Sequence, residues 1–235
     1  MKFTGNTILI TGGAQGIGYA MAEYLSENGN TIIICDRNAA KLDEVREVHP
    51  EFITYVCDLS DKEDRAAFAE KLKAEHPELN FLINNAGIQR NVDLTQGTRD
   101  LDRGDAEIEI NLRAPIYLTA LLLPLLEKNE DSKLLNVCSG LAFAGDRFPE
   151  MPIYCATKAG IHAYTRTARV QFKPLGIRVM EIIPPMVDTN LNPEHAAMLR
   201  AQDPKYSDPD VVPPPDVYVR RTFAKLEDGE DEIKY

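Results

Sequence analysis

The sequence has no long uninterrupted run of apolar residues. Its most hydrophobic stretch, residues 117–126, contains Pro124 and is flanked by charged residues. This stretch is far shorter than the roughly 20 apolar residues that a membrane-spanning helix needs. The chain also starts directly with a predicted strand, without the apolar segment of a cleaved signal peptide. We therefore expect a soluble cytoplasmic protein that has no membrane partner.

Positive charge is scarce as well. The chain carries 26 lysines and arginines against 37 aspartates and glutamates, which gives a formal net charge of -11 at pH 7. An acidic surface repels a polyanion, so we expect no nucleic acid partner.

Cysteine and histidine patterns that are typical of disulfide or metal sites are missing too. The four cysteines, at positions 35, 57, 138 and 155, form no Cys-x-x-Cys pair, and the four histidines have no ligand spacing. We expect reduced thiols that pack as small hydrophobic groups, and no metal site.

What the chain does have is a regular alternation of strand and helix patterns. Strands are predicted at 6–10, 31–35, 53–57, 80–84, 133–138, 177–182 and 231–234. Helices are predicted at 17–28, 39–48, 62–75, 105–127, 153–172 and 216–227. Such alternation indicates a parallel sheet with helices on both faces, which binds ligands where the strand order reverses. We predict an α/β fold, a Rossmann-type doubly wound sheet of about seven strands, in a single domain spanning 1–235.

A glycine-rich segment, residues 11–18 with the sequence TGGAQGIG, joins the first predicted strand to the first predicted helix. Glycines let the backbone turn tightly and approach a pyrophosphate at the helix N-terminus, where free N–H groups favour anions. A glycine turn can be merely structural, but its place between strand and helix favours dinucleotide binding.

Asp36 ends the second predicted strand, where an acidic residue typically receives the ribose hydroxyls of the adenosine. Its carboxylate would repel the extra phosphate of NADP by roughly 1 to 4 kcal/mol. NAD is therefore favoured as the cofactor. NADP stays as the alternative, because Arg37 follows immediately and could pair with that phosphate.

Tyr154 and Lys158 lie four residues apart in the predicted helix 153–172, after Ser139 at the end of an apolar run. Residues at this spacing share a helix face, so the ammonium lies near the phenol. A nearby positive charge favours the phenolate and lowers the tyrosine pKa from about 10 toward the range of a general acid or base. Ser139 would hold a substrate oxygen while Tyr154 moves a proton and a hydride moves at the adjacent carbon.

These motifs make the chain resemble the short-chain dehydrogenase/reductase family over nearly its whole length. The remaining matches are Asp58 after the third predicted strand, the Asn-Asn-Ala-Gly motif at 84–87 after the fourth, and Asn111. The resemblance implies that Tyr154 is the catalytic acid/base and that Ser139 orients the substrate oxygen. It also implies that Lys158 lowers the tyrosine pKa and binds the nicotinamide ribose, and that Asn111 holds a proton-relay water.

The same resemblance implies a cofactor site. Asp58 would contact the adenine edge, Asn85 would tie the central strands together, Gly87 would let the backbone pass close to the cofactor, and Thr189 would bind the nicotinamide carboxamide or a phosphate. The full set that it implies is Gly12, Gln15, Gly16, Ile17, Gly18, Asp36, Arg37, Asp58, Leu59, Asn85, Ala86, Gly87, Tyr154, Lys158, Pro184, Val187 and Thr189.

Two departures from the family concern the substrate side. Pro185 stands where the family commonly has glycine, which stiffens the loop beside the nicotinamide. The segment between Ser139 and Tyr154 is slightly longer than usual, with residues 146–149 inserted near the pocket. The run PPMVDT at 184–189, with 140–143 and 88–90, resembles the bacterial DltE-like branch of oxidoreductases.

The segment 188–216, rich in proline and aspartate, is expected to form a substrate loop or lid. In the family this region covers the substrate. Ordinary packing of a short amphipathic helix explains its apolar residues equally well. The candidates for an apolar pocket wall here and just before it are Met186, Leu191, Met198 and Leu199.

The sequence thus predicts an NAD(P)-dependent oxidoreductase that interconverts a secondary alcohol with a ketone or aldehyde. The alternative is a nucleotide-sensing or scaffold protein on the same fold without turnover, whereas the short C-terminal portion disfavours an epimerase or dehydratase. Broad apolar faces on the helices 105–127 and 153–172 predict a homodimer or homotetramer. They are formed by Ile108, Leu112, Ile116, Ala120 and Leu123 and by Ile161, Tyr164, Ala168 and Phe172.

Overall fold

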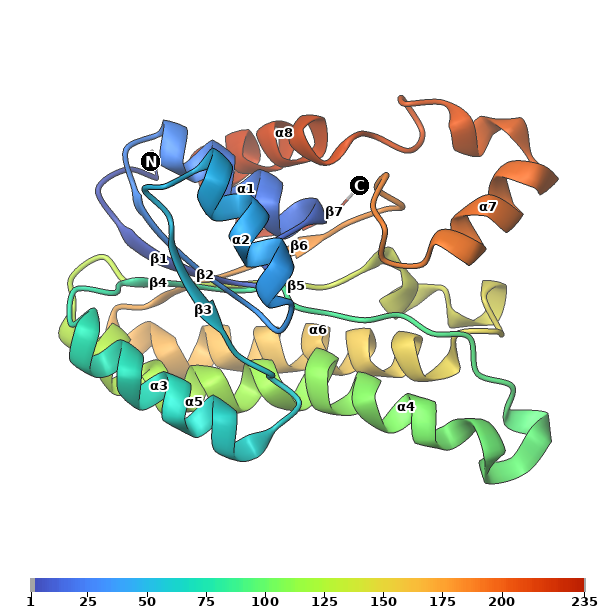
Figure 1. The fold of residues 1–235 in the computed structure, drawn as a ribbon, viewed down its shortest axis with the longest axis horizontal. Helices are drawn as coiled ribbons and strands as arrows, with labels where there is room; N and C mark the ends of the chain where they lie inside the picture. The colour runs from blue at the N-terminus through green and yellow to red at the C-terminus, as the bar shows by residue number, and fades with distance from the viewer. Residues whose placement is uncertain (1–2, 235) are drawn as a thin grey trace.

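The computed structural model describes residues 3–234, apart from the side chains of residues 99, 102 and 103. Seven parallel strands form one sheet in the order β3-β2-β1-β4-β5-β6-β7 (Figure 1). The predicted fold class is confirmed. The strands are β1 (Thr7–Thr11), β2 (Thr31–Asp36), β3 (Ile53–Val56), β4 (Phe81–Asn84), β5 (Lys133–Val137), β6 (Arg178–Ile183) and β7 (Glu232–Lys234).

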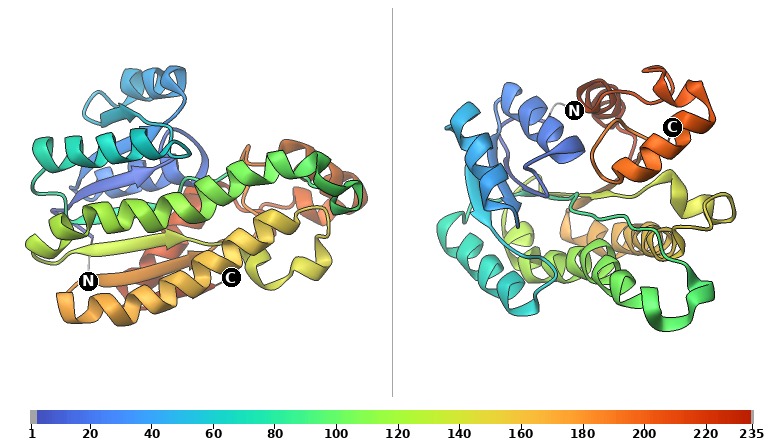
Figure 2. Two further views of the ribbon diagram at one scale, coloured as in Figure 1. Left: turned by 90° about the horizontal axis from the view of Figure 1, so that it is seen from below. Right: turned by 45° about the vertical axis from the view of Figure 1, so that its right-hand side comes forward.

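Helices cover both faces of the sheet. Figure 1 shows α1, α2 and α8 on one side and α3, α4, α5 and α6 on the other, and Figure 2 shows the same layers from two more directions. The helices are α1 (Gly16–Glu27), α2 (Ala39–Val48), α3 (Lys62–Glu75), α4 (Leu101–Ile108), α5 (Ala114–Lys128), α6 (Pro152–Phe172), α7 (Pro193–Gln202) and α8 (Pro215–Glu227).

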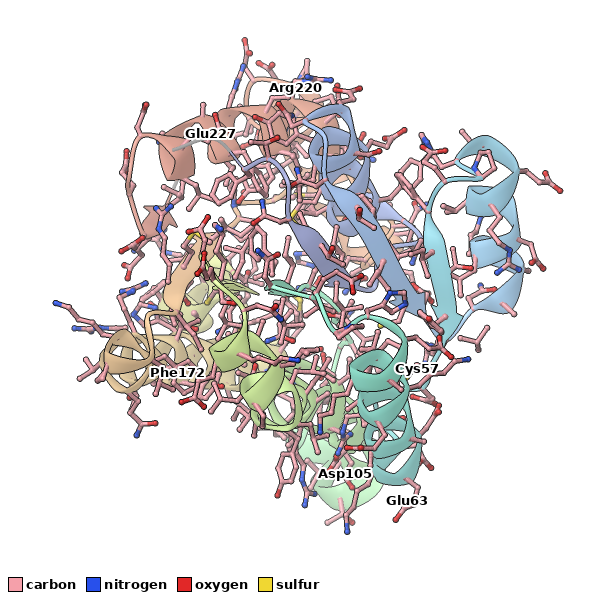
Figure 3. The ribbon with its side chains drawn as sticks, turned by 90° about the vertical axis from the view of Figure 1, so that its left-hand side faces the viewer. Cys57, Glu63, Asp105, Phe172, Arg220 and Glu227 are labelled. Atoms are coloured by element: carbon pink, nitrogen blue, oxygen red, sulfur yellow. The ribbon has the colours of Figure 1, made fainter. Side chains whose placement is uncertain are left out.

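Each face of the sheet has its own apolar core. One core joins the sheet to α1, α2 and α8, and the other joins it to α3, α5 and α6. Every residue of β1, β4 and β5 is buried, as expected for strands covered on both sides. Figure 3 shows side chains filling the space between the sheet and both helix layers. The two cores hold the carboxyl ends of the strands in fixed positions, and the site lies there.

The long predicted helix 105–127 differs from the structure. It is split into α4 and α5 by a π-helical turn, Glu109–Arg113, and the helical path begins at Leu101. Such single π turns inside α-helices occur frequently at functional sites. The turn places Asn111 at the site, as described below.

The helical stretch Gly104–Lys128 also bears on the membrane prediction. By length and composition it is the one helix among the described residues that would reach across a bilayer, with a mean hydropathy of 1.3 over its best window. Leu118, Leu122, Leu125 and Leu126 from this stretch are buried in the core against the sheet. The helical stretch is therefore longer than the apolar run 117–126 on which the sequence expectation was based. Four of its leucines nevertheless pack in the core of the fold.

The prediction that an apolar face of α6 is available for contact with another copy of the chain is wrong in part. Ile161, Ala168 and Phe172 are at most 9 % exposed within their own chain, and Ala168 and Phe172 belong to the core against the sheet. On the α4 to α5 stretch, Ile108 is 41 % exposed and Tyr117 is 45 % exposed. On α6 itself Val170 is 74 % exposed, so exposed apolar side chains occur on both helical stretches.

The strand order reverses between β1 and β4, which are adjacent although two strands separate them in sequence. Loops leaving the carboxyl ends of such neighbouring strands diverge to opposite faces and leave a crevice between them. The glycine-rich segment follows β1 and the Asn-Asn-Ala-Gly motif follows β4. Both motifs therefore border the crevice in which a dinucleotide binds this class of sheet.

Candidate active site

The glycine-rich segment approaches the main chain after β4 more closely than a side chain would allow. Gly12 has φ +63°, and a Cβ atom there would lie 2.9 Å from Cα of Ala86. A Cβ atom on Gly18 would lie 2.3 Å from the carbonyl oxygen of Gly12. Gln15 precedes α1 without a side-chain hydrogen bond to it, and the first turn of α1 carries no acidic residue. The backbone N–H groups of that turn thus suit a pyrophosphate.

Asn85 fastens this glycine turn to the end of β4. Its Nδ2 donates to the carbonyl oxygens of Thr11, at 2.9 Å, and Gly12, at 3.1 Å. The backbone N–H groups of Asn85 and Ala86 both donate to Oγ1 of Thr11 at 3.0 Å. The side-chain amide of Asn85 therefore holds the glycine turn in position against the end of β4.

The residues expected at the adenosine end lie at the carboxyl ends of β2 and β3. Asp36 is half-buried and accepts a hydrogen bond from the backbone of Asn38 at 3.0 Å. The side chain of Asp58 accepts from Oγ of Ser60 at 2.6 Å, and this bond holds the pKa of Asp58 below its ordinary value. The charge of the exposed Arg37 acts on Asp58 in the same direction. Leu59 is buried, and Ile17 packs against the core from α1.

The loop after β6 closes the other side of the crevice. The carbonyl oxygen of Pro184 accepts from the backbone of Gly140 at 2.8 Å, and Val187 is buried. A Cβ atom on Gly16 would lie 3.4 Å from Cγ2 of Thr189. Thr189 therefore lies beside the N-terminus of α1, where the phosphates of a dinucleotide bind in this fold.

The three predicted catalytic side chains Ser139, Tyr154 and Lys158 converge between β5 and α6. Nζ of Lys158 lies 5.6 Å from the centre of the Tyr154 ring and donates to the carbonyl oxygen of Val137 at 2.9 Å. The phenol of Tyr154 hydrogen-bonds with the side chain of Ser139. The helix spacing of four residues and the position of Ser139 after β5 thus bring the three together.

The expected lowering of the tyrosine pKa is wrong for this structure. Tyr154 is only 5 % exposed, and burial, the largest cause, raises its pKa above the ordinary value. The hydrogen bond with Ser139 only partly offsets that rise. Burial also lowers the pKa of Lys158. The sequence expectation counted the charge of the lysine and left out the desolvation of both groups.

Asn111 lies in the π-helical turn and binds the main chain after β4. Its Oδ1 accepts from the N–H of Ile88 and its Nδ2 donates to the carbonyl oxygen of Ile88, both at 2.8 Å. A Cβ atom on Gly87 would lie 3.4 Å from Oδ1 of Asn111 and 3.6 Å from Nζ of Lys158. The side chain of Asn111 therefore holds the loop in place, close to the lysine.

A small cavity of about 10 Å³ lies among polar and apolar groups behind this loop. Its volume is close to the smallest that holds one water molecule. Oδ1 of Asn84 is buried and has no hydrogen-bond partner among the described residues. The polar residues that line the cavity are Asn84, Asn111, Asn136 and Lys158.

Glu107 is a residue of this region that the sequence analysis missed. It is fully buried, and its Oε1 accepts a hydrogen bond from the backbone N–H of Arg90 at 2.9 Å. Burial raises the pKa of Glu107 to about 7. Its charge also affects the pKa values of Tyr154 and Cys155. The signal in the sequence is its spacing of four residues before Asn111, which places both on the side facing the same loop.

The prediction that the chain has no metal site stays a prediction. His162, Glu181 and Glu232 offer ligand atoms that lie within 4.8 Å of one another. These groups already have protein partners, since Nδ1 of His162 lies 2.8 Å from Glu181 and Arg169 lies 3.6 Å from Glu232. The four cysteines are free and buried.

Comparisons with known proteins agree with this geometry. Residues 6–200 match the model of the short chain dehydrogenase family. The uncharacterized oxidoreductase DltE of Bacillus subtilis is 45% identical over 192 residues, which cover 82% of this chain and 75% of that protein.

Two solved structures are similar over nearly the whole chain. A short-chain dehydrogenase from Sphingobium yanoikuyae in complex with NADPH has a TM-score of 0.80 and 26% identity, covering 97% of this chain and 86% of that one. A short chain dehydrogenase from Burkholderia cenocepacia in complex with NADP has a TM-score of 0.77 and 26% identity, covering 99% and 89%.

Proposed function

The chain belongs to the short-chain dehydrogenase/reductase family, in its DltE-like branch, and we propose that it interconverts a secondary alcohol and a ketone or aldehyde. The observation that carries this proposal is the convergence of Ser139, Tyr154 and Lys158 beside the crevice at the β1 and β4 ends. A hydroxyl that orients an oxygen, a phenol that moves a proton and a neighbouring ammonium are the groups that carbonyl reduction requires.

A bound nicotinamide dinucleotide would supply the hydride in reduction and accept it in oxidation. The hydroxyl of Ser139 would hold the substrate oxygen next to the phenol of Tyr154. Tyr154 would donate its proton to that oxygen during reduction and remove it during oxidation. The ammonium of Lys158 would stabilise the phenolate and offset part of the cost of burying it.

The proton of Tyr154 needs a route to solvent after each turnover. We propose that a water in the small cavity between Asn111 and Lys158 forms part of this route. The supporting observations are the polar lining of that cavity and the unpartnered Oδ1 of Asn84 among the described residues. Asn111 would fix the cavity by holding both main-chain groups of Ile88.

For the cofactor, we propose NAD, with NADP as the alternative. The glycine turn and the uncapped start of α1 suit the pyrophosphate of either dinucleotide. Asp36 would accept the ribose hydroxyls and repel the additional phosphate of NADP. The two similar structures that hold NADPH and NADP are reasons to keep the alternative.

We also propose that the chain forms one domain with a lid at 188–216, acts in the cytoplasm and assembles as a homodimer or homotetramer. The lid proposal is supported by α7, which lies within this segment and whose N-terminal end borders a pocket with residues 89–91. The oligomer proposal is supported by the exposed apolar side chains of Ile108 and Tyr117.

The second candidate is a nucleotide-sensing protein without turnover. The raised pKa of Tyr154 favours it, because a strongly held proton is moved slowly. A panel of carbonyl compounds, assayed with NADH and with NADPH, separates the two. Cofactor-dependent reduction of at least one compound supports the enzyme, whereas tight cofactor binding without any change in nicotinamide absorbance supports the sensor.

A further inference from the structure

Glu107 and Asn111 together hold two residues of the loop after β4, on either side of Gln89. Asn111 binds the N–H and the carbonyl oxygen of Ile88, and Oε1 of Glu107 accepts the N–H of Arg90. Gln89 lies between these two residues and forms no hydrogen bond with Glu107 or Asn111 among those of the described residues. The side chains of Glu107 and Asn111 thus fix the main chain of the loop at Ile88 and Arg90. Both side chains come from one helical turn of the α4 to α5 stretch.

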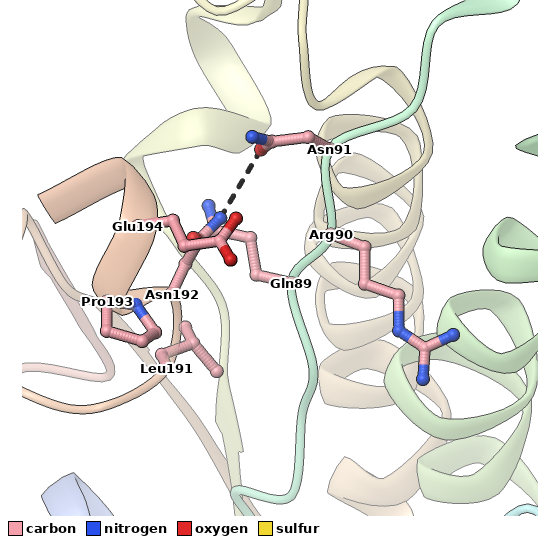
Figure 4. Close-up of a pocket in the computed structure, with 7 residues that line it drawn as sticks. All are labelled: Gln89, Arg90, Asn91, Leu191, Asn192, Pro193 and Glu194. Atoms are coloured by element: carbon pink, nitrogen blue, oxygen red, sulfur yellow. Dashed lines mark hydrogen bonds between the residues drawn. The ribbon is translucent and has the colours of Figure 1, made fainter. Parts of the chain in front are cut away.

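These contacts determine which side chains of the loop meet the neighbouring pocket. Figure 4 shows Gln89 and Arg90 leaving the main chain on opposite sides, with Gln89 directed toward Asn192 and Glu194. Arg90 extends away from them, and its charge stabilises the ionised form of Glu107. A shift of the loop by one residue would bring the side chain of Arg90 to the place of Gln89. The path of the loop therefore determines whether the amide of Gln89 or the guanidinium of Arg90 is directed toward Asn192 and Glu194.

The pocket in question has a volume of about 360 Å³ and lies between the loop and the start of α7. Three amides and one carboxylate line it, together with one cationic and two apolar residues. The amides and the carboxylate come from Gln89, Asn91, Asn192 and Glu194, and the other three residues are Arg90, Leu191 and Pro193. Nδ2 of Asn192 lies 3.4 Å from Oδ1 of Asn91 across it. Nε2 of Gln89 contacts the sulfur of Met151, which packs with Tyr154. The pocket is thus connected to the predicted catalytic tyrosine through Gln89 and Met151.

The chemistry of this lining points to one class of ligand. A carboxamide offers both donors and an acceptor, so it matches a hydroxyl group, which also donates and accepts. The carboxylate of Glu194 accepts from hydroxyls and repels anions. An anionic substrate would need a cation beside these amides. Arg90 also lines the pocket, but its guanidinium is directed away from Asn192 and Glu194 (Figure 4).

We propose that Glu107 is a positioning residue that fixes the path of residues 89–90 while Asn111 holds Ile88, and that the resulting pocket selects neutral carbonyl compounds carrying several hydroxyl groups. The inference rests on the proposed function for the identity of the substrate, whereas the positioning of the loop stands on its own. Oε2 of Glu107 is buried without a hydrogen-bond partner among the described residues. The carboxyl group therefore binds the loop through Oε1 alone. A glutamine would keep that acceptor, and a leucine would remove it.

The first experiment measures amide hydrogen exchange of Ile88 and Arg90 by NMR, which requires no turnover. In Glu107→Leu the Arg90 amide exchanges at least about tenfold faster, because its acceptor is lost, while Asn111 keeps the Ile88 amide protected. Glu107→Gln stays close to the wild type. The matched control is Asp105→Asn, since Asp105 is an exposed acid of the same helix (Figure 3). Unchanged protection of Arg90 in a folded Glu107→Leu, judged by the β4 amides, overturns the positioning role.

The second experiment compares dihydroxyacetone, cyclohexanone and acetoacetate as substrates. The wild type prefers dihydroxyacetone in kcat/KM, and Glu107→Leu raises KM for it about tenfold with little change in kcat. The same variant gains activity on acetoacetate, because the backbone of Arg90 loses its acceptor and the loop can bring the guanidinium closer to the pocket, and Glu107→Gln retains the wild-type order. A wild type that reduces carbonyl compounds but prefers acetoacetate or cyclohexanone overturns the substrate class. If it reduces none, the proposed function fails, and the exchange data still decide the role of Glu107.

Discussion

The Nζ atom of Lys158 lies 5.6 Å from the centre of the Tyr154 ring, and both side chains are buried. Burial raises the pKa of the phenol and lowers the pKa of the ammonium, so each group resists its charged form. A phenolate forms in such a place only if a positive charge remains close. In the proposed mechanism the charge of Lys158 would offset part of this desolvation rather than produce an unusually acidic tyrosine.

This balance predicts the pH dependence of alcohol oxidation. In the proposed mechanism oxidation requires the phenolate, and the raised pKa of Tyr154 means that little phenolate exists at neutral pH. Below that pKa, the rate is expected to rise about tenfold for each pH unit. Steady-state kinetics with NAD from about pH 6 to about pH 9 measure it. A rate that is flat over this range would contradict the dominance of burial, and Lys158→Met should move the rise to still higher pH.

Glu107 provides a second pH prediction, on stability. Burial raises its pKa from 4.5 in the unfolded chain to about 7 in the folded protein. Between these pH values the folded state binds a proton that the unfolded state has released. The free energy of unfolding therefore falls as the pH rises from 4.5 to about 7, and it stays at the lower value above pH 7. Glu107→Gln lacks this loss and should gain at most about 3 kcal/mol over the wild type at pH above 7.

Urea unfolding of the two proteins measures this difference. The gain of Glu107→Gln should be absent below pH 4.5, where both states of the wild type hold the proton, and should reach its full size near pH 7. Asp105→Asn, an exposed acid two residues away, serves as the control and should show no such dependence. A gain that is constant at all pH values would show that burial leaves the ionisation of Glu107 unchanged.

Gly12 tests the cofactor turn. Gly12→Ala places a Cβ atom 2.9 Å from Cα of Ala86, at a residue whose φ is +63°. Gly176→Ala is a matched control, because Gly176 has φ +73° but no atom within 4 Å of the added Cβ. Both variants carry the strain of a left-handed alanine, about 1 to 2 kcal/mol. Only Gly12→Ala should also weaken NADH binding, by at least about tenfold in a fluorescence titration, and equal affinities in the two variants would contradict the close approach.

Asp36 tests the choice of cofactor. Removing its carboxylate in Asp36→Ala relieves a repulsion of roughly 1 to 4 kcal/mol on the extra phosphate, so the ratio of NADPH to NADH affinity should rise at least about fivefold. Isothermal titration with both cofactors gives that ratio. Asp43→Ala, in an exposed position of α2, is the control. Tighter binding of NADPH than of NADH by the wild type would reverse the proposal of NAD.

The sequence predicted those parts of the fold that follow from local pattern. The apolar runs at 7–11 and 81–84 are buried strands because both faces of the sheet are covered. The glycine turn was also predictable, because few residues other than glycine tolerate a φ of +63° beside another backbone. The spacing of Tyr154 and Lys158 needed only the periodicity of a helix.

Other features depend on the whole fold and could not be predicted in this way. The π-helical turn at Glu109–Arg113 changes backbone hydrogen bonding without a pattern of its own in the side chains. The tyrosine pKa depends on how much protein surrounds the phenol, which no spacing of residues reveals. Ile161, Ala168 and Phe172 lie on an apolar face that covers the sheet, and the sequence alone does not tell such a face from one that binds another chain.

The most direct test of the account is turnover by Tyr154→Phe on whichever alcohol or carbonyl compound the wild type accepts. The variant removes one hydroxyl from a buried ring, so the fold and NADH binding should persist while kcat falls by at least about a hundredfold. Tyr117→Phe, which loses the hydroxyl of an exposed tyrosine, should keep the wild-type rate. Undiminished turnover by Tyr154→Phe would contradict the proposal that this phenol moves the proton.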